Sequence, residues 1–346
     1  MAPAFAEVEA LRGEGINAHY AYVGGHKLET KVGHLPFVHP VLQRRQHPGS
    51  FLQSVRSVRK LIEDESIEIA HSHLTHDHWL LRFLFKQNIV VVRSFHSKRA
   101  LRSDPITRHL IRKTDGICVV NRSFLNHPLI KDRPVIITPP PLNTRQFSPL
   151  GESARSLYSI AAETPLVGMI GKVSPGRGFE DGIRTFAVIS SRVPAARMLI
   201  IGRGPHRPFL ERLIRSLQLE QKVTWAGYHE DDLAEHYRAI DVMLFTAPGS
   251  DQGHRALLES LGCGTPMTCY PIEGVEDILG DLSGRLRSSD QSPESLATLA
   301  VNILERREDR AIRTACVERA SHFSYPVSAG RLISLYDGLL HAKRRS

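Results

Sequence analysis

Short runs of β-branched and apolar residues alternate with helical patterns along the chain, and this alternation limits the possible folds more than any other feature. Each run has four to six residues and is flanked by polar or turn residues, as strands are. The runs lie at 18–23, 67–70, 89–92, 116–120, 135–138, 166–171, 198–202, 223–226, 242–245 and 267–270. Helical spacing separates many of them, and two last helices are expected at 293–318 and 326–340. The pattern predicts an α/β protein whose parallel, doubly wound sheets carry helices on both faces.

A proline-rich segment, Pro-Pro-Pro-Leu-Asn-Thr-Arg-Gln-Phe-Ser-Pro at 139–149, interrupts this alternation. Such a segment fits neither a helix nor an inner strand, so we interpret it as a linker. A chain of 346 residues is also long for one core. We expect an N-terminal domain at 1–150, a C-terminal domain at 151–322 and a last helix at 323–346 that packs back toward the N-terminal domain.

Composition favours a globular protein outside the membrane. No apolar run approaches the ~20 residues that a membrane-spanning helix needs, and the N-terminus lacks the pattern of a signal peptide. The four cysteines show no CxxC or other metal-binding spacing, which suits a reducing compartment. We therefore expect a cytoplasmic location.

The positive charge lies in the N-terminal half. Residues 1–150 hold 21 Lys+Arg against 12 Asp+Glu, whereas 151–346 hold 24 of each, so the first half carries the whole net charge of +9. This asymmetry favours an anionic partner, such as a phospholipid surface, a phosphorylated glycan or a nucleic acid. A solvated basic face without a partner is the alternative. Nucleic acid is the least favoured, because aromatic residues are not interleaved with the basic ones.

A glycine-containing loop between two carboxylates follows the run at 242–245. It reads Asp251-Gln-Gly-His-Arg-Ala-Leu-Leu-Glu259 and continues as Ser-Leu-Gly-Cys-Gly-Thr-Pro at 260–266. A strand, a loop with Gly253 and the start of a helix together favour an anion or a polyhydroxyl ligand. The carboxylates of Asp251 and Glu259 suit the adjacent hydroxyls of a ribose or a hexose. The alternative is that a carboxylate here only caps the helix.

A second glycine-rich loop, Gly171-Lys-Val-Ser-Pro-Gly-Arg-Gly178, follows the run at 166–171. Lys172 and Arg177 flank glycines where a helix begins, which favours a diphosphate ligand. The loop lacks the GK[ST] ending of a Walker A motif. The turn Gly202-Arg-Gly204 lacks the third glycine of a dinucleotide site. Solvent-facing cations at an ordinary turn remain the alternative.

Histidines occur densely at 71, 73, 76 and 78. Imidazoles are common metal ligands, but no acidic or cysteine set completes a tetrahedral site, although Asp77 is near. We expect loop-end histidines that contact substrate or solvent instead. His96 differs because it lies at the carboxyl end of an inner strand, where ligands of α/β sheets bind. A purely structural role for His96 stays open.

Taken in order, these segments resemble the retaining nucleotide-sugar glycosyltransferases of glycosyltransferase family 4. The loop at 171–178 is similar to the family's GR-x-x-x-x-KG element with its two cations exchanged, and 251–259 resembles the E-x7-E signature. Further similarities lie at 147–149, 202–205, 223–228, 237–242, 262–266 and 323–336. The resemblance implies the GT-B fold, in which two Rossmann-like domains face each other across a cleft.

The resemblance also implies how the donor phosphates are handled. Lys172 and Arg177, beside Gly171, would bind the donor diphosphate and stabilise its departure, which is electrostatic catalysis. His96 would lie close to the reacting sugar. Neither a metal nor another cofactor is implied.

The second loop would hold the rest of the donor. Glu259 would bind the ribose hydroxyls, and Asp251 would contact the transferred sugar. Backbone amides around Gly253, His254 and Arg255 would help to hold that sugar and the phosphates.

The implied activity is transfer of a sugar, with retention, from a nucleoside diphosphate-sugar to a glycan or glycolipid acceptor of the cell-envelope polysaccharide or lipopolysaccharide type. Such an enzyme would be cytoplasmic or peripheral on the inner face of the membrane. Two alternatives stay open. One is a non-catalytic nucleotide-sugar-binding or scaffold protein, and the other is a GT-B nucleotide-sugar epimerase.

Two departures from the family pattern bear on activity. Asp251 stands where the family has Glu, so the side chain is one methylene shorter. The chain also begins in the expected first helix, with Phe5, Val8 and Leu11 on one face, so the first strand and its Gly-rich loop are missing from the sequence as written. The alternatives are a start codon placed too late, which we favour, and a degenerate or partner-dependent protein.

Overall fold

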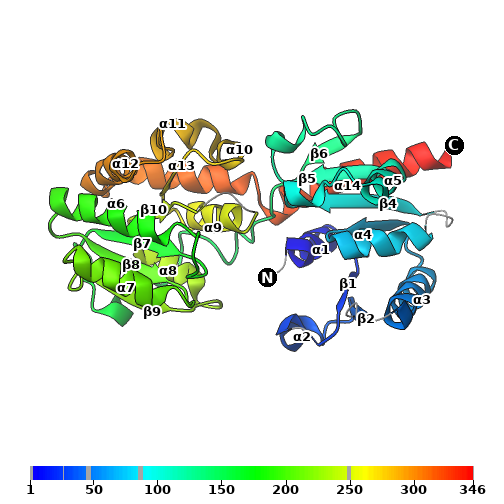
Figure 1. Cartoon of the computed structure of the whole chain (residues 1–346), viewed down its shortest axis with the longest axis horizontal. Coiled ribbons are helices and arrows are strands. Elements are labelled where there is room, and N and C mark those ends of the chain that lie inside the picture. Colours follow the sequence, from blue (N-terminus) through cyan, green and yellow to red (C-terminus); the bar gives the residue numbers. More distant parts are fainter. Residues whose placement is uncertain (1–2, 26, 44–47, 85–88, 248–250, 346) are drawn as a thin grey trace. The chain divides into compact units, whose positions relative to one another are not determined.

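The computed structural model describes residues 3–25, 27–43, 48–84, 89–247 and 251–345, without the side chains of residues 27, 28, 48, 84 and 251–253. The chain forms two compact units (Figure 1). The first unit contains Met1–Pro141 and Tyr325–Ser346, and the second contains Leu142–Ser324. Their boundary therefore lies inside the proline-rich segment. In the described part of the chain, no helix combines the length and the apolar character needed to cross a bilayer.

The first unit contains two parallel sheets, one of four strands in the order β3-β4-β5-β6 and one that pairs β1 with β2. The strands are β1 (Tyr20–Val23), β2 (Val38–Leu42), β3 (Ile69–Ser72), β4 (Val90–Phe95), β5 (Gly116–Val119) and β6 (Val135–Ile137). The helices are α1 (Pro3–Gly13), α2 (Lys27–Val32), α3 (Pro48–Asp64), α4 (Thr75–Leu81), α5 (Pro105–Arg112) and α14 (Tyr325–Arg344).

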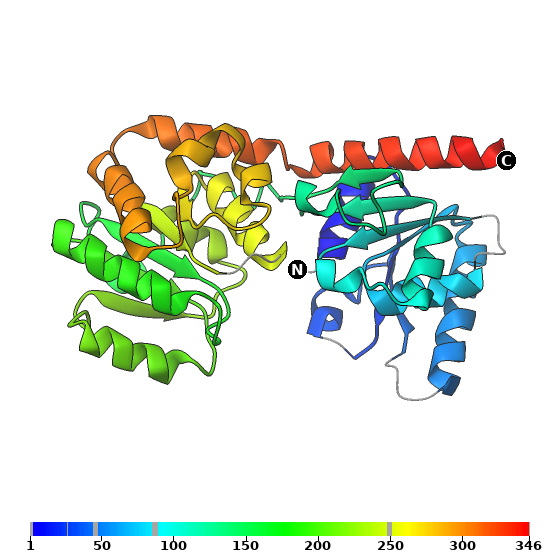
Figure 2. The ribbon, with the colours of Figure 1, turned by 45° about the horizontal axis from the view of Figure 1, so that its top comes forward.

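Helices cover both faces of the four-stranded sheet, because alternate residues of a strand point to opposite faces. On β4, Val90 and Val92 pack in one cluster with residues of α1 and α14. Val91 packs in another cluster with residues of α3 and α4. All three valines are at most 2% exposed, and burial of each contributes roughly 1.5–3 kcal/mol. Helix α14, drawn red, runs beside the sheet in both views (Figures 1 and 2).

The second unit is built on one parallel sheet with the strand order β11-β10-β7-β8-β9. The strands are β7 (Leu166–Ile170), β8 (Arg197–Ile201), β9 (Val223–Gly227), β10 (Val242–Phe245) and β11 (Met267–Cys269). The helices are α6 (Phe179–Arg192), α7 (Arg207–Ser216), α8 (Leu233–Ala239), α9 (Asp251–Gly262), α10 (Val275–Leu279), α11 (Ser283–Leu286), α12 (Pro293–Glu305) and α13 (Arg310–Ser321). One apolar cluster joins the sheet to α6, α7 and α12, and another joins it to α8, α9, α10 and α13.

This strand order creates a switch point between β7 and β10. The chain passes from β7 outward to β8 and β9, then returns to place β10 on the other side of β7. Ligands of doubly wound sheets bind outside the carboxyl ends of the strands at such a point. The loop that follows β7 contains Lys172 and Arg177, and the segment that follows β10 leads into α9. Both candidate binding loops therefore emerge at the switch point of the second unit.

Most predicted elements are confirmed, including the helix that carries Phe5, Val8 and Leu11 on its buried side. The single helix expected at 293–318 is wrong. Two helices, α12 and α13, occupy this region, because Asp309 caps the start of α13 by accepting a hydrogen bond of 2.8 Å from the amide of Ala311. The sequence did not predict β2 or the helices α2, α4, α10 and α11. The expectation that the N-terminal domain lacks its first strand stays a prediction.

Candidate active site

The loop between β7 and α6 presents two cations. Lys172 is exposed and Arg177 is half-buried. Among the residues that the structure describes, neither side chain forms an ion pair, although Glu180 and Asp181 lie in the first turn of α6. Uncompensated cations at the amino end of a helix form a favourable site for a phosphate group.

Gly178 fixes this loop against the end of β10. Its φ of 76° is in the left-handed region, and its carbonyl accepts a hydrogen bond of 2.5 Å from the hydroxyl of Thr246. A Cβ atom at Gly178 would lie 2.4 Å from the carbonyl carbon and oxygen of Thr246. Only glycine permits this approach, so the two loops at the switch point are held in register.

We predict that Gly178→Ala disturbs the site far more than Gly176→Ala. The two glycines have similar φ values, 76° and 69°, so backbone strain is matched. A Cβ atom at Gly176 meets nothing within 4 Å, whereas one at Gly178 meets backbone. Gly176→Ala should cost about 1 kcal/mol of unfolding free energy, and Gly178→Ala should cost about 2–3 kcal/mol or more. Urea denaturation of both variants checks this, and equal losses would show that the contact does not hold the loop.

Glu259 lies on α9 and is 5% exposed. Its Oε1 accepts a hydrogen bond of 2.7 Å from Nε of Arg255, and its Oε2 accepts one of 3.1 Å from the hydroxyl of Tyr237. Burial raises the pKa of Glu259, while the Arg255 guanidinium opposes this shift. The carboxylate is therefore held in one orientation by two donors.

Tyr237 is a site residue that the sequence did not identify. It is fully buried on α8. Its hydroxyl orients the Glu259 carboxylate by donating a hydrogen bond to it. Its pKa is raised well above the usual value by burial and by the Glu259 charge, so it remains a donor. Tyr237 begins the segment 237–242, which resembles the family. That resemblance does not tell whether the tyrosine only packs in the core or also orients the Glu259 carboxylate.

The prediction that Asp251 to Gly253 form a loop is wrong, because α9 already begins at Asp251. The residues at the start of this helix are described in part. The side chains of Asp251 and Gly253 lie outside the described residues. His254 is 3% exposed, and its Nε2 lies 2.9 Å from the carbonyl oxygen of Glu273. The imidazole is thus buried within the second unit and lies against a backbone carbonyl.

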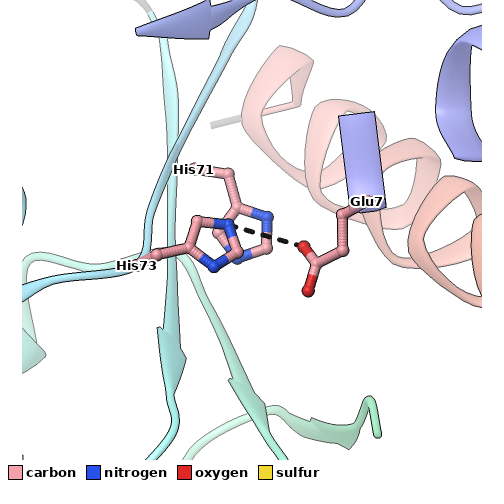
Figure 3. A group of neighbouring side chains, drawn as sticks. All are labelled: Glu7, His71 and His73. Carbon is pink, nitrogen blue, oxygen red and sulfur yellow. Dashed lines mark ion pairs between the residues drawn. The ribbon is translucent and has the colours of Figure 1, made fainter. Parts of the chain in front are cut away.

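Three histidines of the first unit, His71, His73 and His96, form a connected group with Glu7. Figure 3 draws Glu7, His71 and His73. Nδ1 of His71 lies 2.7 Å from the Tyr336 hydroxyl, and its Nε2 lies 2.8 Å from the Ser94 hydroxyl. Nε2 of His73 lies 3.4 Å from Oε2 of Glu7, and its Nδ1 lies 3.1 Å from Nε2 of His96. Through this contact with His73, His96 belongs to the same group.

The expectation of loop-end histidines that meet substrate or solvent is wrong for two of the four. His71 lies within β3, where both ring nitrogens have partners in the first unit. His78 lies on α4 with 3% exposure, and its Nε2 is 2.8 Å from the Thr114 hydroxyl. The sequence failed here because β3 and α4 extend over residues that it assigned to a loop.

Burial favours the uncharged forms of Glu7, His71 and His73. It lowers the pKa of His71 to about 3 and that of His73 well below the usual value, with nearby cationic groups adding to both shifts. It raises the pKa of Glu7, which is 5% exposed, to about 8. The carboxyl and both imidazoles are therefore uncharged near neutrality.

Glu7, His71 and His73 are also of the types that bind divalent metals, and their donor atoms lie within 4.8 Å of one another. Both ring nitrogens of His71 are already hydrogen bonded, so a metal would have to displace Tyr336 or Ser94. The geometry therefore favours a hydrogen-bonded network at this position.

A second group with metal-binding residue types lies in the second unit. Nδ1 of His229 is 2.7 Å from a carboxylate oxygen of Asp232, and Nε2 of His236 is 2.8 Å from the Tyr158 hydroxyl. The ring nitrogens of His236 are both occupied, because Nδ1 lies 3.0 Å from the Asp232 carbonyl. Through the contact between His236 and Tyr158, this group connects α8 to the turn that contains Tyr158.

Comparisons with known proteins agree with the geometry of the second unit. The sequence model of the glycosyl transferases group 1 matches residues 153–321. An N-acetyl-alpha-D-glucosaminyl L-malate synthase from Bacillus anthracis is 24% identical over 86% of this chain and 80% of its own. A D-inositol 3-phosphate glycosyltransferase from Streptosporangium roseum is 24% identical over 86% of this chain and 76% of its own. The chain spans about half or less of several other relatives that it matches.

A solved structure is similar over both units. The crystal structure of HepE from Anabaena in complex with UDP superimposes with a TM-score of 0.80 at 15% identity, and the match covers 97% of both chains. This likeness shows the GT-B fold, with two Rossmann-like domains built on parallel sheets. The family match over residues 153–321, together with the two loops at the switch point, identifies this segment as a glycosyltransferase domain of the group 1 family, glycosyltransferase family 4.

Proposed function

We propose that the protein transfers a sugar, with retention of anomeric configuration, from a nucleoside diphosphate-sugar to an acceptor that carries carboxylate or phosphate groups. The observation that supports the donor most strongly is the pair of uncompensated cations, Lys172 and Arg177, at the switch point of the second unit. The buried carboxylate of Glu259 on the neighbouring helix adds an acceptor for ribose hydroxyls.

In this mechanism the protein supplies charge and position. Lys172 and Arg177 bind the diphosphate and stabilise the negative charge that grows as the bond between the sugar carbon and the phosphate oxygen breaks. The acceptor hydroxyl attacks from the same face, and its proton passes to the departing diphosphate oxygen. Asp251 and the amides at Gly253, His254 and Arg255 hold the sugar, and we assign His96, which follows β4, to the same reacting sugar.

The acceptor proposal rests on charge. The first half of the chain carries the whole net charge of +9, and the names of both long-matching relatives refer to an acidic or phosphorylated compound, L-malate and D-inositol 3-phosphate. A basic surface attracts such anions by long-range electrostatics. An acidic glycan or a phosphorylated glycolipid at the inner membrane face would satisfy the same chemistry.

A panel that combines several sugar donors with several acceptors tests this proposal. UDP-, GDP- and ADP-sugars would be incubated with L-malate, inositol 3-phosphate, the neutral compound inositol, or vesicles that contain anionic lipid, and products would be identified by mass spectrometry. We expect transfer to an anionic acceptor and at least tenfold less to inositol, with the soluble and vesicle arms separating a small acceptor from a glycolipid. Efficient transfer to inositol would contradict the anionic acceptor.

The same assay distinguishes the alternatives from the sequence. Binding of a nucleoside diphosphate without turnover of any donor would favour a scaffold protein, and conversion of the donor sugar without an acceptor would favour an epimerase. If the vesicle arm shows binding, added salt should weaken it, because electrostatic attraction to a charged surface is screened.

A further inference from the structure

Three histidine rings of the first unit lie in a column that ends at the proposed catalytic histidine. The ring centroids of His71 and His73 are 4.6 Å apart, and those of His73 and His96 are 5.4 Å apart, with interplanar angles of 29° and 22°. Figure 3 shows the carboxyl group of Glu7, on α1, directed at the rings of His71 and His73. The mechanism given above uses only His96.

Glu7 is the unusual member of this group. Its Oε2 is buried and makes no hydrogen bond with a described residue, while Nε2 of His73 lies 3.4 Å away. That separation is about 0.4 Å beyond an ordinary N···O hydrogen bond, a gap that a small rotation of the side chain closes. A buried carboxyl aimed at an imidazole indicates a positioning role for the pair, as in other carboxyl–histidine arrangements.

We propose that Glu7 and His73 form a relay that decides which ring nitrogen of His96 carries its proton, and that they thereby position His96 for the transfer reaction. The chain of contacts runs from Oε2 of Glu7 to Nε2 of His73, and from Nδ1 of His73 to Nε2 of His96. Glu7 and His73 act through His96, so they are positioning residues. The inference rests on the proposed function of His96.

The relay has two states, because each ring nitrogen of a neutral imidazole is either a donor or an acceptor. When Glu7 is protonated, it donates to Nε2 of His73, His73 donates through Nδ1, and Nε2 of His96 accepts. His96 then carries its proton on Nδ1. When Glu7 is ionised, every bond reverses, and His96 carries its proton on Nε2. The burial that raises the pKa of Glu7 to about 8 makes the first state the neutral-pH form.

Other groups around the relay favour its neutral form. His71 of β3 stacks on His73, which follows that strand, and Arg93 on β4 adds a positive charge that lowers the pKa of His73. Burial raises the pKa of Cys118 on β5 and of Tyr336 on α14, and the Glu7 charge adds to both shifts. None of these groups carries a negative charge at pH 7, so Glu7 is the group whose ionisation reverses the relay between pH 6 and 9.

The test reads the His96 tautomer directly. In full-length protein labelled with 15N-histidine, the nitrogen shifts of His96, assigned with His96→Gln, would be followed from pH 6 to 9. We expect the proton to move from Nδ1 to Nε2 with a midpoint near pH 8 in the wild-type protein. In Glu7→Gln the side chain cannot ionise, so His96 should keep one and the same tautomer at every pH. Glu9→Gln, two residues along the same helix, is the matched control and should switch as the wild type does.

A second variant and a second readout keep the test decisive. His73→Phe breaks the chain of contacts, so His96 should lose the switch even if Glu7→Gln does not fold. In the transfer assay, wild-type kcat should fall by up to tenfold per pH unit above about 8, with little change in KM, and Glu7→Gln should remove that fall.

Several results would overturn the relay. One is a His96 tautomer that stays the same in the wild-type protein from pH 6 to 9. Another is a Glu7→Gln variant in which the His96 proton still moves between the two ring nitrogens, as in the wild type. Loss of the switch on adding a chelator, with recovery on adding Zn²⁺, would show a metal site instead. The NMR experiment needs no turnover, so an inactive protein that still switches would contradict the proposed function and leave the relay intact.

Discussion

Replacing both Lys172 and Arg177 with alanine is expected to lower kcat/KM for the nucleotide-sugar donor by about a thousandfold or more. Removal of one group that stabilises charge in a transition state typically costs about 10²–10³-fold, and these two cations face the same departing diphosphate in our proposal. Because Lys172 is exposed and neither side chain has an ion pair among the described residues, the fold should survive the change. Steady-state kinetics with the best donor from the panel provides the measurement.

The control for this double variant is Arg215→Ala. Arg215 is an exposed cation on α7 of the same unit, so its removal changes the net charge of the unit without touching the loop. We expect less than a twofold change in kcat/KM for the control and unchanged thermal midpoints for both proteins. Full activity in the Lys172/Arg177 double variant would refute the assignment of the phosphate site.

Glu259→Ala is expected to have the second largest effect, about a hundredfold or more on kcat/KM. The carboxylate is the group that we assign to the ribose hydroxyls, and without it Arg255 and Tyr237 both lose their acceptor. The sharper readout is discrimination between a nucleoside diphosphate and its 2′,3′-dideoxy analogue. Wild-type protein should bind the ribonucleotide at least tenfold more tightly, and Glu259→Ala should bind the two equally, as calorimetry would show.

Tyr237→Phe distinguishes the contribution of the Glu259 carboxylate from that of the hydrogen bond that Tyr237 donates to it. It removes one hydrogen bond, which contributes about 1 kcal/mol, but leaves the carboxylate and its bond to Arg255 in place. We expect a modest loss of affinity and intact discrimination between the two nucleotides. If Glu259→Ala still preferred the ribonucleotide, the ribose hydroxyls would have to be recognised elsewhere.

The sequence predicted the second unit well because its strands are buried on both faces. Met198 and Ile200 pack against helices on one face, and Leu199 and Ile201 pack against helices on the other. Such strands appear in the sequence as continuous apolar runs, which are easily recognised. Lys172, Arg177 and Glu259 were found from their positions after such runs, and the structure places their loops at one switch point.

The first unit was harder to predict because its signals are weaker. Strand β2 contains Pro40 and β3 is only four residues long, with three of its positions partly exposed. Glu7 appeared in the sequence as an ordinary polar residue of an amphipathic helix. Its burial depends on the packing of α1 beside α14 and β4, which joins residues more than 300 positions apart, and no local pattern encodes such a contact.

The most direct test of the central claim is to follow the reaction of the wild-type protein by proton NMR with a nucleoside diphosphate-sugar and an anionic acceptor. We predict that nucleoside diphosphate is released in step with a new glycoside whose anomeric proton has the configuration of the donor. A product of inverted configuration would contradict the retaining mechanism. The absence of transfer from every nucleoside diphosphate-sugar in the panel would contradict the assignment of Lys172, Arg177 and Glu259 as a working donor site.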